Sequence, residues 1–289
     1  MQQLKVLQSL WAMERREPDG FERTLEENLH IIAAASFDGV SYFLGDRDQT
    51  QTFKKLVNGT GLAIEACGLP ASDDDLRRQI ALAGELNPLH YNVQPDVRLR
   101  GLAEGAHLME RWIRISESAG FPVYFETHRN RLTTDLFYTL DLMDAVPDIP
   151  LLADLSHFLV GREFAWPVSA ENHRLIERIL DSSWAFHGRV ASREQVQIEI
   201  SFPHHKMWVN LFASWWRYGF RSWRRRAQSD AVLSFTCELG PRPYAITNRA
   251  GQDSTDRWAE ALLMRGLVTD IWADSGENGT ISSTARSKF

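Results

Sequence analysis

The sequence has few of the features that mark secreted or membrane-embedded proteins. Its 289 residues include two cysteines, Cys67 and Cys237, too few for the disulfide framework of a small secreted domain. No apolar run approaches the ~20 residues that a transmembrane helix needs. The first ten residues lack the apolar core and small-residue cleavage site of a signal peptide. We therefore expect a soluble cytoplasmic protein that has no membrane partner.

Basic residues are also fewer than acidic ones, 32 against 38. The formal net charge is −6 and the isoelectric point about 5.9, which disfavours binding to nucleic acid or to an anionic membrane. No Gly-x-Gly-x-x-Gly follows the first strand-like segment, where a dinucleotide-binding fold places it. We therefore expect a protein that acts on, or binds, a small molecule.

What the sequence does contain is an alternation of short apolar runs with longer stretches of helical period. The eight runs that predict strands are Lys5–Leu10, Gly39–Leu44, Gly61–Cys67, Pro88–Val93, Pro122–Glu126, Pro150–Asp154, Trp184–His187 and Val232–Glu238. Eight strand–helix units close naturally into a parallel barrel. We therefore expect a single (β/α)8 TIM barrel over residues 1–273 and a disordered tail over residues 274–289, with an open doubly wound sheet as the alternative.

The connection between the last two predicted strands, residues 192–231, is unusually long. Its segment 206–226 is rich in tryptophan and arginine, with apolar residues at helical spacing. These are Trp208, Leu211, Phe212 and Trp215. One interpretation is an outer helix whose aromatic side chains pack on the barrel. The other is a subunit interface or an anion-attracting lid, because aromatic and arginine side chains are enriched at interfaces.

Four consecutive predicted strands end in a polar residue. In a TIM barrel the carboxyl ends of the strands converge on one mouth, so Glu126, Asp154, His187 and Glu238 should meet there. Burying such charges costs several kcal/mol unless they are paired, and a shared divalent cation removes that cost. Three carboxylates and one imidazole suit Mn²⁺, Mg²⁺ or Co²⁺, and Zn²⁺ is also compatible. The alternative is four unrelated residues, each satisfied by a helix N-terminus or an ion pair.

The order Glu126, Asp154-x-x-His157, His187 and Glu238 resembles the metal-site pattern of the xylose-isomerase-like TIM-barrel superfamily, the sugar phosphate isomerase/epimerase family. The resemblance covers nearly the whole chain in strand order and is specific over the segment from Tyr124 to Pro241. It implies that the Glu, Asp, His and Glu bind one divalent metal ion. It also implies that the two glutamates serve as acid and base, and that the enzyme is a homodimer or homotetramer.

The same resemblance implies substrate contacts. His157, which follows the aspartate, would contact the substrate, as would an arginine shortly after the third ligand, where Arg189 and Arg193 both fit. Further candidates come from their positions beside the mouth: Trp11 after the first strand, Asn92 in the fourth and His128 after the fifth. As alternatives, His128 is a second acid/base group or an exposed loop histidine.

These residue types fit the chemistry of keto sugars. Isomerising or epimerising such a sugar begins with removal of a proton beside the carbonyl. A metal ion stabilises the resulting enediolate and carboxylates move the proton. We therefore expect a metal-dependent, for example manganese-dependent, isomerase or epimerase of carbohydrate metabolism. A lyase or dehydratase acting on a keto-sugar or cyclitol is the alternative. A phosphodiesterase of the endonuclease IV kind is disfavoured by the acidic isoelectric point, and a barrel that binds a sugar without turnover is the non-catalytic possibility.

Overall fold

The computed structural model describes residues 1–17 and 19–276 as a closed barrel of eight parallel strands. Consecutive strands pair, and β1 closes the barrel against β8. The strands are β1 (Gln3–Ser9), β2 (Gly39–Phe43), β3 (Ala63–Gly68), β4 (His90–Val93), β5 (Val123–Glu126), β6 (Leu151–Ala153), β7 (Ser183–Gly188) and β8 (Val232–Cys237). Every predicted strand is present, and its ends differ from the predicted ones by at most two residues. The closed barrel is confirmed and the open sheet is excluded.

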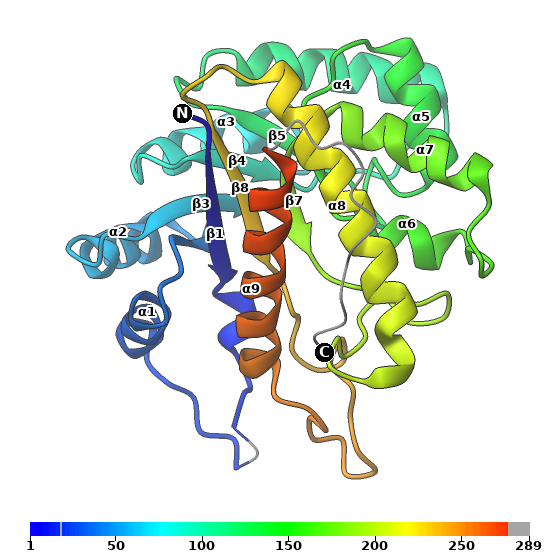
Figure 1. The fold of residues 1–289 in the computed structure, drawn as a ribbon. Helices are drawn as coiled ribbons and strands as arrows, with labels where there is room; N and C mark the ends of the chain where they lie inside the picture. Colours follow the sequence, from blue (N-terminus) through cyan, green and yellow to red (C-terminus); the bar gives the residue numbers. More distant parts are fainter. Residues whose placement is uncertain (18, 277–289) are drawn as a thin grey trace.

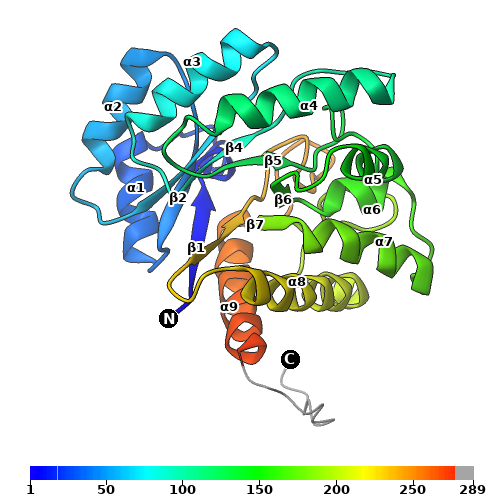
Figure 2. The ribbon, with the colours of Figure 1, turned by 90° about the horizontal axis from the view of Figure 1, so that it is seen from above.

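Helices surround the barrel and connect its strands. They are α1 (Leu25–Ala34), α2 (Arg47–Val57), α3 (Asp73–Gly84), α4 (Leu102–Ser116), α5 (Leu136–Ala145), α6 (Ser156–Gly161), α7 (Ala170–Asp181), α8 (Lys206–Arg226) and α9 (Arg257–Ser275). Figure 2 shows them as a ring around the strands. Local sequence explains where several begin: Thr24 and Asp46 form capping boxes that satisfy free N–H groups of α1 and α2. None of the described helices combines the length and apolar character needed to cross a bilayer.

Helix α8 is an amphipathic outer helix, as the first interpretation of segment 206–226 predicts. The apolar side chains at helical spacing, from Trp208 to Trp215, are buried. The next turn adds Trp216, whose ring meets that of Phe235 in β8 edge-on at 5.1 Å. Helix α8 lies between α7 and α9, beside β7 and β8 (Figure 1). Helix α9 extends through Ser275, and the part of the expected tail from residue 277 onward lies outside the described residues.

The interior of the barrel contains polar side chains, which form hydrogen bonds with one another. Successive side chains of a strand point to opposite faces, and several inward ones form hydrogen bonds across the interior. The Thr236 hydroxyl of β8 donates to Glu65 of β3 at 3.0 Å, and His90 of β4 lies 2.7 Å from Ser234 of β8. All four side chains are buried. The barrel is therefore lined by groups that need partners, rather than by an apolar core.

Candidate metal centre

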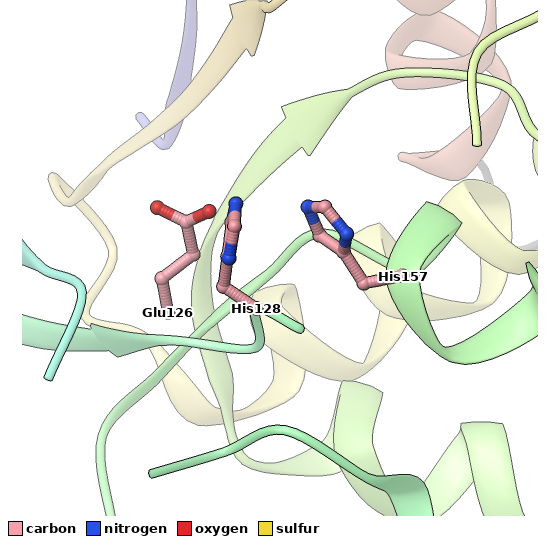
Figure 3. Close-up of side chains that lie close together, drawn as sticks. All are labelled: Glu126, His128 and His157. Atoms are coloured by element: carbon pink, nitrogen blue, oxygen red, sulfur yellow. The ribbon is translucent and has the colours of Figure 1, made fainter. Parts of the chain in front are cut away.

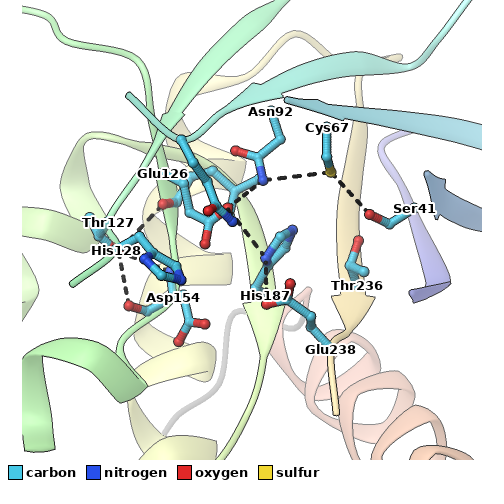
Figure 4. Close-up of polar contacts among 12 residues, drawn as sticks. Ser41, Cys67, Asn92, Glu126, Thr127, His128, Asp154, His187, Thr236 and Glu238 are labelled. Carbon is cyan, nitrogen blue, oxygen red and sulfur yellow. Dashed lines mark hydrogen bonds and ion pairs between the residues drawn. The ribbon is translucent and has the colours of Figure 1, made fainter. Parts of the chain in front are cut away.

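The four predicted strand-end residues meet at the carboxyl end of the barrel (Figure 4). Glu126 ends β5, Asp154 and Glu238 directly follow β6 and β8, and His187 lies near the end of β7. One carboxylate oxygen or ring nitrogen from each lies within 4.8 Å of the others. All four side chains are buried, with at most 3% of any residue exposed. The four strand ends therefore contribute to one site, as their positions in the sequence predict.

His187 lies at the centre of a group of carboxylates. Its Nδ1 is 3.1 Å from Oε2 of Glu238 and 3.8 Å from Oε2 of Glu126. Its Nε2 is 2.9 Å from Oε1 of Glu65, which reaches across from β3. Burial would raise the pKa of Glu65, but the rings of His187 and His90 outweigh burial and hold that pKa well below its usual value. Glu65 is therefore an ionised acceptor behind the histidine.

Glu126 has one carboxylate oxygen fixed and one free. Its Oε2 accepts hydrogen bonds from the side-chain amides of Asn92 and Gln94. Its Oε1 is buried and has no hydrogen-bond partner among the described residues. Burial, only partly offset by the His187 ring, raises the pKa of Glu126 to about 8. A buried oxygen without a partner is costly, and a cation shared with the neighbouring carboxylates would satisfy it.

Arg189 is buried within the cluster and binds two of its carboxylates. Its Nη1 lies 3.1 Å from Oδ2 of Asp154, and its Nη2 lies 2.6 Å from Oε2 of Glu238. Its Nε donates to the backbone carbonyl of Glu238 at 3.0 Å. Burial would raise the pKa of Glu238, but Arg189 and His187 outweigh it and bring that pKa to about 2. Glu238 is therefore ionised at neutral pH.

Two neutral histidines lie on one side of Glu126, with His128 between Glu126 and His157 (Figure 3). The ring centroids of His128 and His157 are 3.9 Å apart, and a ligand atom of each lies within 4.8 Å of one Glu126 oxygen. Burial lowers the pKa of His128 to about 4 and that of His157 well below its usual value. Because a guanidinium only donates, the Nε2 of His157, 3.1 Å from Nη1 of Arg189, accepts. The His157 proton is then on Nδ1, which has no partner among the described residues.

A cavity of about 600 Å³ opens above the cluster at the mouth of the barrel. Its wall includes Trp11, Gln94, His128, Arg131, Glu238 and Tyr244. The rings of Trp11 and Tyr244 meet edge-on at 5.2 Å. Among the four clustered residues, Glu238 is the one that reaches the cavity wall. The volume is in the range of small-molecule sites, and the wall combines aromatic with polar side chains.

The fold of this chain was compared with those of known proteins. No family model and no curated protein matches the sequence. Solved structures do match. A xylose isomerase-like TIM barrel protein from Mycobacterium smegmatis, in complex with magnesium, has a TM-score of 0.61 at 15% identity, covering 94% of this chain and 98% of that one. D-allulose 3-epimerase from Methylomonas sp., in complex with D-allulose, has a TM-score of 0.59 at 13% identity, covering 93% and 97%.

A probable 3-DHS dehydratase from Bacillus anthracis has a TM-score of 0.55 at 13% identity, covering 92% of this chain and 98% of that one. Likeness at such identities concerns the fold. This chain has the same (β/α)8 barrel fold as these proteins. It spans nearly the whole length of each of these three proteins.

In this barrel, two of the six predicted substrate-binding residues line the cavity and four do not. His157 and Arg189 contact each other beside the cluster, while Trp11 and His128 line the cavity. Asn92 is fully buried and donates to Glu126. The Arg193 side chain is 46% exposed and lies near surface carboxylates of Glu163 and Glu194. Of the two arginine candidates, Arg189 is the one at the site.

Glu65 was not among the predicted site residues. Its signal was present in the run Ala63–Gly68, where an acidic residue interrupts a buried strand. The partner His187 is 122 residues away in the sequence, so nothing local indicates what the carboxylate binds. Tyr244 was also not predicted, because it lines the cavity from a loop whose path the strand pattern does not define.

Proposed function

We propose that this protein is a divalent-metal-dependent isomerase or epimerase of a small sugar or sugar phosphate. The observation that carries the proposal is the cluster of Glu126, Asp154, His187 and Glu238, whose ligand atoms lie within 4.8 Å of one another in a buried site. The free Oε1 of Glu126 supports it further, since that oxygen has no protein partner among the described residues.

The donor set fits a hard divalent ion. Three carboxylates and one imidazole suit Mn²⁺, Mg²⁺ or Co²⁺, and the Mycobacterium smegmatis protein of the same fold is in complex with magnesium. Charge supports this assignment. A divalent cation together with the Arg189 guanidinium would balance the three carboxylates when His187 is neutral. Such an ion, when bound, supplies polarisation of the substrate carbonyl and stabilisation of enediolate charge.

The two glutamates are placed to exchange protons with a substrate. Glu238 is ionised and reaches the cavity wall, so it is placed to remove a proton from the carbon beside the substrate carbonyl. Burial raises the pKa of Glu126 to about 8 in the metal-free protein, and a bound cation would displace this proton. Glu126 would then act as the second carboxylate, which takes up a proton from one substrate group and returns it to another.

The groups around the cavity suit a polyhydroxylated substrate. Trp11 offers an aromatic face, and the side chains of Gln94 and His128 offer polar groups for hydroxyls. His128 donates its Nδ1 hydrogen to the carbonyl of Arg129, with the two atoms 2.6 Å apart, which leaves Nε2 as an acceptor. The Methylomonas protein of the same fold binds D-allulose, a ketose. A homodimer or homotetramer, as the resemblance implies, is part of this proposal.

The experiment is solvent exchange in D₂O. The purified protein, loaded with Mn²⁺ or Co²⁺, is incubated with a panel of ketoses and ketose phosphates, and deuterium at the carbon beside the carbonyl is followed by NMR. The proposal predicts incorporation with at least one substrate and none with a Glu238→Gln variant that still binds metal. Absence of exchange across the panel in a protein with stoichiometric metal contradicts it.

A dehydratase is the second candidate, and one observation favours it. His128 and His157 place two extra imidazoles beside Glu126, and elimination needs a further group to protonate the leaving hydroxyl. The Bacillus anthracis protein of the same fold is a probable dehydratase. Both reactions begin with proton removal beside a carbonyl, so the products separate them: an unsaturated product absorbs in the ultraviolet, whereas an epimer does not.

A further inference from the structure

A second cavity, of about 510 Å³, lies at the opposite end of the barrel from the metal centre. We call it the amino-end cavity, because it lies where β4, β5, β7 and β8 begin and where α8 ends. The arrow of β1 points downward in Figure 1, so the amino end of that strand is at the top of the view. The side chains that matter for its chemistry are His90, Tyr124, Trp184, Trp223 and Arg226. Neither the catalytic proposal nor the fold comparison gives this cavity a role.

Three large aromatic side chains contribute to the walls of the amino-end cavity. Trp184, Trp223 and Tyr124 line it, and the ring of Tyr124 lies 4.9 Å from that of His90. The remaining wall is largely aliphatic. Aromatic walls favour a flat ring, which packs against them by stacking or edge contacts.

Arg226 brings a positive charge to this cavity, and it has no ion-pair contact within the described residues. Its Nη2 donates to the carbonyl of Ser183 at 2.6 Å, and its guanidinium lies over the ring of Trp184 at 4.6 Å. Its Nε is buried without a partner, and no carboxylate of the described residues lies within ion-pair distance. None of the cavity-lining residues is acidic. A guanidinium held in this way is a site for a carboxylate, which accepts in the plane of the fork.

The end of helix α8 does not cancel this attraction. Carbonyl groups at a helix C-terminus repel anions, and Arg226 is in the last turn of α8. Here the side-chain amide of Gln2 donates to the carbonyls of Arg224 and Ala227, at 2.9 and 3.1 Å. Two of the carbonyl groups that would oppose an anion are thus already occupied.

His90 supplies the second polar contact. The residue is 2% exposed, and its Nε2 lies 2.7 Å from the Ser234 hydroxyl and 3.3 Å from the Glu65 carboxylate. A nitrogen beside a carboxylate carries the hydrogen, which leaves Nδ1 as an acceptor. That Nδ1 is buried and has no partner among the described residues. It therefore fits a ligand that can donate from a hydroxyl group.

We propose that the amino-end cavity binds a small aromatic carboxylate that carries a hydroxyl group. The carboxylate accepts from Arg226, the ring packs among the aromatic walls, and the hydroxyl donates to Nδ1 of His90. The ligand is a non-covalent occupant, and the proposal is independent of the reaction at the metal centre.

The test is calorimetric titration of the full chain with 3- and 4-hydroxybenzoate. A ligand of this size should bind with a Kd of about 0.1–1 mM. The Arg226→Gln variant should bind at least about tenfold more weakly, since it loses a charge-assisted contact. The matched control is Arg225→Gln, which removes the same charge from an exposed neighbour and should bind like the natural protein. The uncharged hydroxybenzamides should also bind at least about tenfold more weakly.

A second variant distinguishes loss of the ligand contact from misfolding of Arg226→Gln. Ala231 lines the cavity and forms hydrogen bonds through its backbone, so Ala231→Phe fills the space and keeps the arginine. It should abolish binding without changing Tm by more than a few degrees. The proposal is overturned if the natural protein shows no saturable binding of either hydroxybenzoate at concentrations well above about 1 mM. It is also overturned if Arg226→Gln or Ala231→Phe binds normally, or if a crystal soaked with ligand shows water alone in this cavity.

Discussion

Glu65 and His187 face each other across the barrel interior, with Oε1 of the carboxylate 2.9 Å from Nε2 of the ring. They come from strands β3 and β7, which are not neighbours in the sheet. The ionised carboxylate favours hydrogen on Nε2 and leaves Nδ1 directed at Glu126 and Glu238. A carboxylate behind a metal-binding histidine fixes both the ring orientation and the tautomer. Glu65 is therefore expected to position His187 rather than to touch substrate.

The first prediction is that Glu65→Gln weakens metal binding by roughly 10–100-fold, because the neutral amide no longer selects the tautomer. Titration with Mn²⁺ measures the affinity. The matched control is Thr236→Val, which removes one hydrogen bond to the other carboxylate oxygen and leaves the contact with His187. Its affinity should stay within a few-fold of the natural protein. Equal Mn²⁺ affinity in Glu65→Gln and the natural protein would show that Glu65 has no positioning role.

The second prediction concerns protons displaced by the metal. Without a cation, the pKa of Glu126 is about 8, and the three surrounding carboxylates outweigh burial and raise that of His187 well above its usual value. Both groups therefore hold a proton at neutral pH that a metal ion must displace. Apparent Mn²⁺ affinity should rise between about pH 6 and pH 8, and calorimetry in buffers of different ionisation enthalpy should detect proton release. Affinity that does not change with pH would contradict these protonation states.

The third prediction concerns stability. The folded pKa of Glu126 is about 8, against an ordinary value of 4.5, so the unfolded chain loses this proton first as pH rises. The free energy of unfolding should therefore fall between these two values and stay lower above them. Glu126→Gln should raise the Tm of metal-free protein at alkaline pH by roughly 2–8 °C, with little effect below the ordinary pKa. Scanning calorimetry with a chelator present measures this, and a lower alkaline Tm in the variant argues against it.

The fourth prediction separates the two arginine candidates. Arg189 helps to hold the pKa of Glu238 at about 2, so Arg189→Met should raise that pKa and move the acidic limb of the pH–rate profile to higher pH. The kcat/KM should also fall by about 10²-fold or more, since a buried charged donor is lost. Arg193→Met is the control, because that side chain is 46% exposed and pairs only with surface carboxylates. A large loss in Arg193→Met with none in Arg189→Met would reverse the assignment.

The strands were predictable because each depends on local sequence. Apolar runs between stretches of helical period mark all eight, and consecutive pairing then closes the barrel. The cluster followed from the same logic, since the carboxyl ends of consecutive strands meet at one mouth. Glu126 and Asp154 could be placed together without any knowledge of their side-chain contacts.

Contacts between distant segments could not be predicted in this way. Glu65 and His187 are 122 residues apart, and only the closed barrel brings them face to face. Likewise, spacing alone left Arg189 and Arg193 as equal candidates. They differ because Arg189 follows directly from β7 and its side chain is buried under the carboxylates, whereas Arg193 lies further along a loop that has returned to the surface. Asn92 was expected at the substrate, but its amide is used by Glu126.

Whether the four clustered residues bind one divalent ion is tested most directly by a crystal structure of the protein grown with Mn²⁺, with anomalous data collected near the manganese edge. We expect one strong peak within about 2.0–2.4 Å of an oxygen from each of Glu126, Asp154 and Glu238 and of Nδ1 of His187. A fully occupied peak bound by other residues, or no peak in protein saturated with Mn²⁺, would contradict it.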